Sequence, residues 1–371
     1  MNQMPRSPTK QIPALTAIRG IAAWWVVLYH FSEQLRFVVP SPALIIIGRG
    51  YLAVDLFFVL SGFVIALNYA AMFEAATVEA YLRFLMLRLA RIYPLHLFIM
   101  LLFLANPAAI ALFSSSGHIG QRYDAIYFVA SLFLVQNWGF DYLAWNIPAW
   151  SISTEWFAYL VFPAIAWVTS VTSRTISSAW FCISVLLIAL AAATVSIGGG
   201  SLATSIVPTA LARCVLEFSM GVYLFRVYAR RDGLSRGHGN LAGLAALICF
   251  GSYLFVPLPD YALVPLGIVF LIHALTDETC LLSRALSLRA LEMAGLVSYS
   301  TYLAHYLIKD WTKFLLVRPG IPAIVPVANY LLLVAIASVV LYRYIEVPGR
   351  RAFRALSLRL PSLWTAAPAR R

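Results

Sequence analysis

Arg19 and His30 are two residues of the first apolar run whose side chains could act on a substrate. They stand eleven residues apart in LTAIRGIAAWWVVLYH, so both project from nearly the same face of a helix, about 16 Å apart along its axis. An imidazole can act as a general base or as a nucleophile, and a guanidinium binds anions through a planar fork. Taken alone, the pair also fits an arginine that extends to the membrane surface and a hydrogen-bonded core histidine.

Arg88 and Arg91 form a second candidate site in LRLARIYPLHL. At a spacing of three residues they share one helix face. Two adjacent cations at the mouth of an apolar helix suit phosphate or another anion. The alternative is ordinary anchoring of a helix end by basic residues, which is the usual role of a single arginine there.

Three carboxylates stand inside or beside apolar runs. They are Asp55 in YLAVDLFFVLSGFVIAL, Glu155 in NIPAWSISTEWFAYLVFP and Glu346 in LYRYIEVPGR. A charge inside a membrane span costs at least about 2.5–3.5 kcal/mol, so each one needs a partner. We expect Asp55 or Glu155 to orient His30, and Glu346 to pair with an arginine. Asp55 could instead cap a helix or support a helix contact, with Gly62 permitting close packing.

The composition indicates that these residues are positioned by membrane-spanning helices. Apolar residues make up 62% of the chain and charged residues 11%, against about 45–50% and about 25% in soluble domains. Such a chain needs a lipid bilayer as its solvent. The net charge of +12 comes from basic residues at the ends of apolar runs, which is typical of membrane topology and argues against nucleic acid as a partner. The predicted fold class is all-α, a polytopic membrane helical bundle.

Ten apolar runs are long enough to cross a bilayer, at about 20 residues each. They lie near 14–31, 50–70, 84–108, 148–170, 178–197, 204–228, 240–258, 261–276, 291–316 and 322–346. An eleventh run, 125–137, is shorter, and we predict that it is re-entrant or interfacial. With ten crossings the basic loops fall on the cytoplasmic side, as the positive-inside rule requires.

This topology places both termini in the cytoplasm. Residues 1–13 form a cytoplasmic segment, 14–346 the transmembrane domain, and 347–371 a basic tail that we expect to contact anionic membrane lipids. Arg19 interrupts the first run, so we interpret it as a retained span and not as a cleaved signal. The four cysteines are widely spaced and form no CxxC pair, which favours buried thiols over a metal site or a disulfide framework.

The order of the motifs resembles the acyltransferase 3 family of integral membrane proteins, over about residues 14–353. The motifs are Arg19-x10-His30, VDLFFVLSGF, RLARIYP, PAWSISTEWF, SYSTYLAH and YRYIEVPGR. The resemblance implies an enzyme of the bacterial inner membrane that O-acylates surface polysaccharides, most often by O-acetylation. It also implies the stand-alone form of the family. One departure is Thr16, which stands where the family has an acidic residue near Arg19.

The resemblance also implies the substrates and their sites. The donor is acyl-coenzyme A, most often acetyl-CoA, on the cytoplasmic side, and the acceptor is a carbohydrate or glycolipid hydroxyl on the other. No cofactor is expected to stay bound. Arg19, Arg88 and Arg91 would hold the nucleotide phosphates, and His30 would receive the thioester. The remaining candidates for the substrate site are Ser61, Trp150 and Glu346, beside Asp55 and Glu155 as catalytic candidates.

Two questions stay open from the sequence. His30 could deprotonate the acceptor for direct transfer, or it could carry the acyl group covalently. The alternative function is a transporter for a polar or anionic solute, because intramembrane His, Asp and Arg also mark ion paths. Transporters often have internal repeats with matching sites in each half. Here the ionisable residues crowd into the first quarter of the chain, which favours the enzyme.

Overall fold

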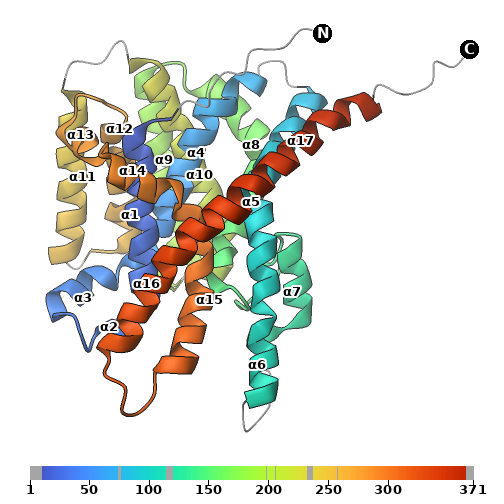
Figure 1. Cartoon of the computed structure of the whole chain (residues 1–371). Coiled ribbons are helices and arrows are strands. Elements are labelled where there is room, and N and C mark those ends of the chain that lie inside the picture. The colour runs from blue at the N-terminus through green and yellow to red at the C-terminus, as the bar shows by residue number, and fades with distance from the viewer. Residues whose placement is uncertain are drawn as a thin grey trace, which may run out of the picture.

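The computed structural model describes residues 11–73, 77–113, 120–197, 199–204, 206–231, 237–256 and 258–364, which form helices joined by turns. The long helices lie side by side in one bundle (Figure 1). The predicted all-α membrane bundle is confirmed. Because α1 begins and α17 ends at the top of Figure 1, we call this the upper end, and the end near α2 and α3 the lower end.

The long helices are α1 (Pro13–His30), α4 (Ala53–Tyr69), α5 (Val78–Phe103), α8 (Trp150–Thr172), α9 (Ile176–Ser196), α10 (Ile206–Ala229), α11 (His238–Phe255), α12 (Asp260–Leu275), α15 (Ser298–Leu316) and α16 (Ile324–Leu341). Shorter elements connect or extend them: α2 (Ser32–Leu35), α3 (Ser41–Ile47), η1 (Gly50–Leu52), η2 (Ala70–Phe73), α6 (Ala105–Phe113), η3 (Gln121–Tyr123), α7 (Ala125–Leu132), η4 (Ile147–Ala149), α13 (Leu281–Leu286), α14 (Arg289–Leu296), η6 (Tyr342–Glu346) and α17 (Val347–Trp364).

Each of the ten predicted spans contains a long helix, but two of them differ from the prediction in extent. The run 291–316 is divided at Val297 into α14 and α15. The run 322–346 continues without a break as far as Trp364. The run 125–137 contains only α7, which at eight residues is about 12 Å long, against a hydrocarbon core of about 30 Å. α7 is thus too short to cross.

Seven helical stretches of the described chain are long and apolar enough to cross a membrane, and they contain α4, α5, α8, α9, α10, α11 and α16. The other three predicted spans are α12, with only 16 residues, and α1 and α15, which carry ionisable side chains. The multi-pass membrane architecture is therefore clear. The count of ten crossings stays a prediction.

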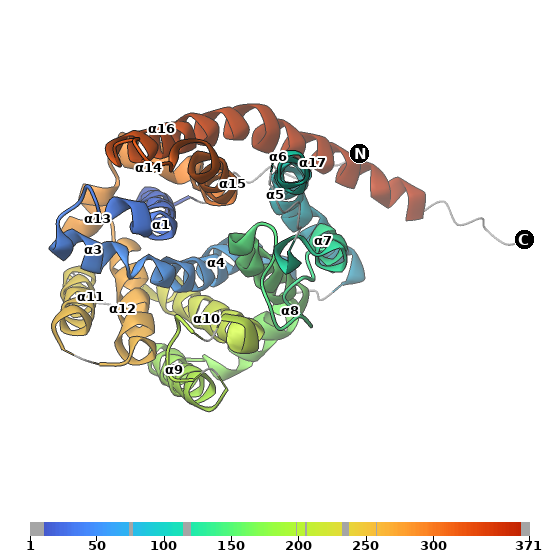
Figure 2. The same cartoon turned by 90° about the horizontal axis from the view of Figure 1, so that it is seen from below.

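α4 lies in the middle of the bundle, in contact with α1, α8, α10 and α12 (Figure 2). Its contact with α10 is a direct meeting of backbones. A Cβ at Gly62 would lie 1.9 Å from Phe218 O, and a Cβ at Gly221 would lie 1.9 Å from Val59 O. Only glycine fits at either position, so the prediction that Gly62 permits close packing is confirmed.

A π-helical turn, η6, joins α16 to α17 and carries Glu346 into the bundle, where it is 1% exposed. The first turns of α17 then pack against α5, with Gly349 against Pro94 and the ring of Phe353 6.3 Å from that of Tyr93. The basic tail therefore begins as a packed helix. Its last residues, 365–371, and residues 1–10 lie outside the described residues, and the predicted domain limits stay a prediction.

Candidate active site

Arg91 and Glu346 form the centre of a charged cluster inside the bundle. Arg91 Nη1 donates to Glu346 Oε1, and Ser300 Oγ donates to Glu346 Oε2 at 2.8 Å. The predicted pairing of Glu346 with an arginine is thus confirmed. Arg19 lies within electrostatic range of Arg91, Glu346 and Glu155. The carboxylates of Glu346 and Glu155 both act electrostatically on the Arg19 guanidinium.

Arg88 lies one turn before Arg91 on α5 and borders the same cluster. It donates to the hydroxyl of Tyr69 and lies over the rings of Tyr69 and Tyr159, at 4.5 and 5.9 Å from their centroids. Tyr159 in turn donates to Glu155 Oε1 at 2.6 Å, and Ser61 Oγ donates to the same oxygen. The structure therefore brings together six predicted site residues, which we call the arginine cluster: Arg19, Ser61, Arg88, Arg91, Glu155 and Glu346.

His30 lies at the last residue of α1, and its nearest polar partner on another helix is His305. His30 Nδ1 is 3.2 Å from His305 Nε2, and the two ring centroids are 5.1 Å apart. His305 is fully buried, whereas His30 is half-buried. The His30 ring also packs nearly perpendicular to the ring of Tyr306, with centroids 5.3 Å apart. The two histidines form a pair between α1 and α15.

Backbone carbonyls determine which nitrogen of each histidine carries a proton. His305 Nδ1 lies 2.6 Å from Tyr302 O, and His30 Nδ1 lies 3.0 Å from Val26 O. A carbonyl only accepts, so both Nδ1 atoms are N–H donors in the neutral rings. His305 Nε2 then accepts from the shared N–H of His30. His30 Nε2 keeps its lone pair, and within the described chain no donor occupies it.

This geometry corrects the prediction that Asp55 or Glu155 orients His30. That position belongs to His305, while Glu155 is bound to Ser61 and Tyr159. Asp55 is bound elsewhere, as described next. Whether either carboxylate takes part in catalysis stays a prediction.

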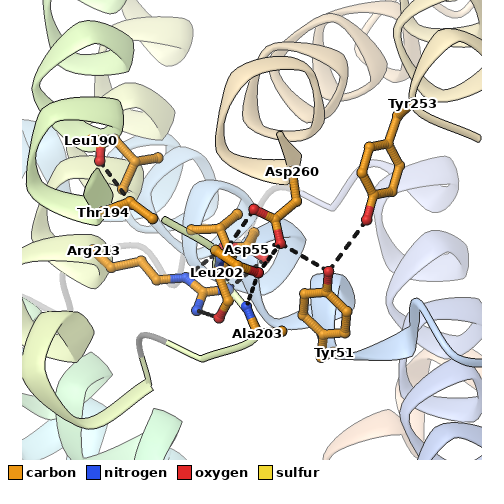
Figure 3. Close-up of polar contacts among 10 residues, drawn as sticks. Tyr51, Asp55, Leu190, Thr194, Leu202, Ala203, Arg213, Tyr253 and Asp260 are labelled. Carbon is orange, nitrogen blue, oxygen red and sulfur yellow. Dashed lines mark hydrogen bonds and ion pairs between the residues drawn. The ribbon is translucent and has the colours of Figure 1, made fainter. Parts of the chain in front are cut away.

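Asp55 forms a bidentate salt bridge with Arg213 of α10. Arg213 Nε donates to Oδ1 and Nη2 to Oδ2, each at 2.7 Å, and the two residues are 0% and 1% exposed (Figure 3). Arg213 Nη1 also donates to Leu202 O at 2.9 Å. Glu217, one turn along α10 and likewise fully buried, places a second carboxyl group beside the pair. A pair this deep fixes α4 against α10.

Asp260, at the start of α12, extends this network toward the lower end. It accepts from Leu202 N at 3.0 Å and from the Tyr51 hydroxyl at 2.8 Å (Figure 3). The Ser201 hydroxyl also donates to it at 2.8 Å. An open pocket of about 470 Å³ borders these residues. The network thus ties the turn before α4, the segment before α10 and the first turn of α12 into one corner of the bundle.

Trp150 is a buried core residue, 5% exposed, and packs edge-to-face on Phe58 at 5.9 Å between ring centroids. The adjacent Ser151 hydroxyl lies 2.9 Å from the hydroxyl of Tyr302, whose carbonyl accepts from His305. Trp150 therefore belongs to the helix that supports the histidine pair, and its predicted substrate contact stays a prediction.

Three buried ionisable residues had no predicted role: His305, Arg213 and Lys309. His305 was visible in SYSTYLAH but had no assigned role, because nothing local indicates that it meets His30. Arg213 and Lys309 stand within predicted spans. The rule that an intramembrane charge needs a reason would have singled them out. The four cysteines, as expected, are free thiols, and Cys214, Cys249 and Cys280 are buried.

The sequence model of the acyltransferase 3 family, described as an acyltransferase domain, matches residues 12–343. The chain belongs to this family. The acyltransferase is 28% identical over 330 residues to the acyltransferase MdmB of Streptomyces mycarofaciens, covering 80% of this chain and 79% of the relative. It is 25% identical over 371 residues to the O-acetyltransferase OatA of Staphylococcus aureus, covering 92% of this chain and 58% of the relative. No solved structure matches.

The acyltransferase is therefore a multi-pass membrane O-acyltransferase, as the sequence motifs imply. Family membership decides against the transporter interpretation. The chain covers only 58% of the length of OatA. The activity of the whole OatA protein is therefore not assigned to this chain by the similarity alone.

Proposed function

We propose that this acyltransferase moves an acetyl group from acetyl-coenzyme A to a hydroxyl of a carbohydrate or glycolipid. The observation that carries the proposal is the arrangement along α1. His30 Nε2 keeps its lone pair at one end of the helix, and Arg19 lies about 16 Å back along the same axis. The similarity to OatA, an O-acetyltransferase, supports acetyl as the group.

The arginine cluster is the proposed donor site. Arg19, Arg88 and Arg91 hold the nucleotide phosphates through bidentate and charge-assisted hydrogen bonds. All three are half-buried and so retain surface for a ligand. The pantetheine arm then runs along α1 toward the lower end. The distance between Arg19 and His30 is comparable to the length of that arm, so the thioester arrives beside His30.

His30 is the proposed general base. The acceptor oxygen attacks the thioester carbonyl carbon while its proton passes to His30 Nε2. The tetrahedral intermediate collapses by breaking the C–S bond, and the sulfur of coenzyme A leaves with the proton that His30 returns. His305 acts as the positioning residue, because its lone pair holds the Nδ1–H of His30 and thereby fixes the reactive tautomer.

The proposed location is the bacterial cytoplasmic membrane, with the upper end of the bundle in the cytoplasm. The distribution of basic residues supports this orientation. It presents the arginine cluster to cytoplasmic acyl-CoA and the histidine pair to an acceptor on the other side. Membrane lipids surround the chain, and nucleic acid has no part in the function.

The proposed function is tested with inside-out and right-side-out membrane vesicles that contain the acyltransferase. Acetyl-CoA labelled in the acetyl group is added outside, and label in the glycan fraction is counted before and after mild alkali, which cleaves O-acetyl esters. We expect alkali-labile label from inside-out vesicles and little from right-side-out ones. No label from either, across several acyl-CoA donors and with the protein present, would contradict the function. Equal label from both would contradict the orientation.

Arg88→Ala is expected to raise the KM for acetyl-CoA roughly 10- to 100-fold, since a hydrogen bond to a charged group contributes about 1.5–3 kcal/mol. Arg88 suits this test because its contacts are the hydroxyl of Tyr69 and two rings, so no buried carboxylate loses its partner. The rate is measured as coenzyme A released at increasing donor concentration.

Two comparisons sharpen the Arg88 test. Arg83→Ala removes an exposed arginine from the same helix and should leave the KM unchanged. S-acetylpantetheine lacks the nucleotide phosphates, so the wild type and Arg88→Ala should use it equally well. A KM for acetyl-CoA unaffected by Arg88→Ala would remove Arg88 from the donor site.

A further inference from the structure

Lys309 is a buried cation near the histidine pair that the proposed mechanism does not use. It lies four residues after His305 on α15, so both side chains project from one face of the helix. The residue is 9% exposed, and its charge acts on both His30 and His305. A charge in such a place is expensive and calls for a function.

The ring of Tyr306 connects Lys309 to His30. Lys309 Nζ lies 3.2 Å from the centroid of that ring, and the His30 ring centroid is 5.3 Å from the same point. The ammonium and the imidazole thus lie against the same side chain. Tyr306 is itself buried, at 7% exposed, so its ring is a fixed wall that limits where Lys309 can move.

Lys309 has an aromatic ring beside its ammonium but no carboxylate of the described chain within hydrogen-bonding range. Its nearest carboxylate oxygen is Asp310 Oδ1, at 3.9 Å, which is too long for a hydrogen bond. Asp310 is already bound by Arg122 and by Asn106 Nδ2, the latter at 3.2 Å. Within the described residues no acceptor lies in hydrogen-bonding range of Lys309 Nζ.

Among the described residues, Arg213 is the one other lysine or arginine that is buried, and it differs in this respect. Both of its bonds to Asp55 are charge-assisted hydrogen bonds of 2.7 Å. The Lys309 side chain is 11% exposed, so the ammonium is open to a ligand that can replace water as the acceptor of its hydrogen bonds. Acyl transfer generates such a group, because the thioester carbonyl oxygen becomes an oxyanion beside the general base.

We propose that Lys309 is a catalytic residue that stabilises the oxyanion of the tetrahedral intermediate; this rests on the proposed function. As the acceptor oxygen attacks and its proton passes to His30 Nε2, the carbonyl π electrons move onto the carbonyl oxygen. The Lys309 ammonium donates a hydrogen bond to that oxygen. When the C–S bond breaks, the electrons return to form the ester carbonyl, and Lys309 keeps its proton throughout.

The test measures coenzyme A release from acetyl-CoA by the purified full-length chain in liposomes, with water and with glycerol as acceptors. Lys309→Met removes the charge and keeps an apolar side chain of similar length. We expect kcat to fall about 10²- to 10³-fold with both acceptors, the cost of one oxyanion donor, while the KM for acetyl-CoA stays within about threefold. Lys309→Arg keeps the charge and should retain more activity than Lys309→Met.

Lys313→Met is the matched control. Lys313 lies one turn further along α15, where its Nζ is 2.5 Å from Glu33 Oε2 and the pair is largely solvated. Its replacement should leave kcat unchanged. Lys309→Cys, alkylated with 2-bromoethylamine to restore an ammonium, should recover part of the lost kcat, which a role in folding alone would not allow.

Each other result overturns the assignment. Unchanged kcat in Lys309→Met, beside an active wild type, removes Lys309 from the reaction. A loss seen only with glycerol, and not with water, makes Lys309 an acceptor-binding residue instead. A wild-type chain that consumes no acyl-CoA overturns the proposed function itself, and the oxyanion role with it.

Discussion

Replacing His30 by alanine is expected to abolish measurable acetyl transfer while leaving the chain inserted in the membrane. The loss of a general base alone reduces a rate by roughly 10²- to 10⁴-fold. His30 is half-buried at the end of α1, and its ring makes one hydrogen bond within its own helix and one to His305. Its removal therefore disturbs the chemistry far more than the packing.

The measurement is labelled acetyl transfer per amount of protein in the membrane, with His305→Ala as the companion variant. His305→Ala leaves His30 Nε2 in place but removes the acceptor for its Nδ1–H, so we expect a smaller loss than in His30→Ala. Full activity in His30→Ala would remove His30 from the mechanism. Equal losses in both variants would show that His305 does more than position its partner.

Replacing Asp55 by alanine is expected to destabilise the fold more than any other single change considered for this chain. Arg213 would be left 1% exposed without its carboxylate partner. Breaking a buried ion pair from one side lowers the free energy of unfolding by roughly 3–5 kcal/mol. The variant should therefore unfold at a lower temperature in detergent and accumulate less in the membrane.

Glu33→Gln is the control for Asp55→Ala, because it breaks an ion pair that is largely solvated. The hydrogen bond from Lys313 lowers the pKa of Glu33, so that carboxylate is ionised at neutral pH. A solvated pair contributes no more than about 1 kcal/mol, and the thermal midpoint should barely move. If Asp55→Ala unfolds at the wild-type temperature but is inactive, Asp55 acts in catalysis and not in the fold.

The spans, the shared face of Arg88 and Arg91, and the need of Glu346 for a cation could be predicted because each depends on local pattern. Apolar runs of bilayer length become helices, since a helix satisfies its own backbone hydrogen bonds in lipid. Arg88 and Arg91 share a face by helical periodicity. Glu346 follows a span with arginines nearby, and a buried carboxylate requires a cation. These inferences use only neighbours in sequence and the cost of an unpaired charge.

The partners of His30 and Asp55 could not be predicted because they depend on how distant helices are placed. His305 is 275 residues from His30, and Arg213 is 158 residues from Asp55. With several carboxylates and arginines available, the sequence did not indicate which pairs would form. The reciprocal contact of Gly62 and Gly221 brings α4 and α10 together, and so selects Arg213 for Asp55.

The number of residues in the π turn between α16 and α17 determines which face α17 turns toward the bundle. Each residue of an α-helix advances the chain by about 100°, and a π turn inserts one residue more than the α register needs. The extra residue rotates α17 about the helix axis. It therefore determines which face of α17 packs against α5, and it also directs Glu346 inward. A one-residue deletion there would act as a rotation of the whole carboxyl-terminal helix and not as a shortening.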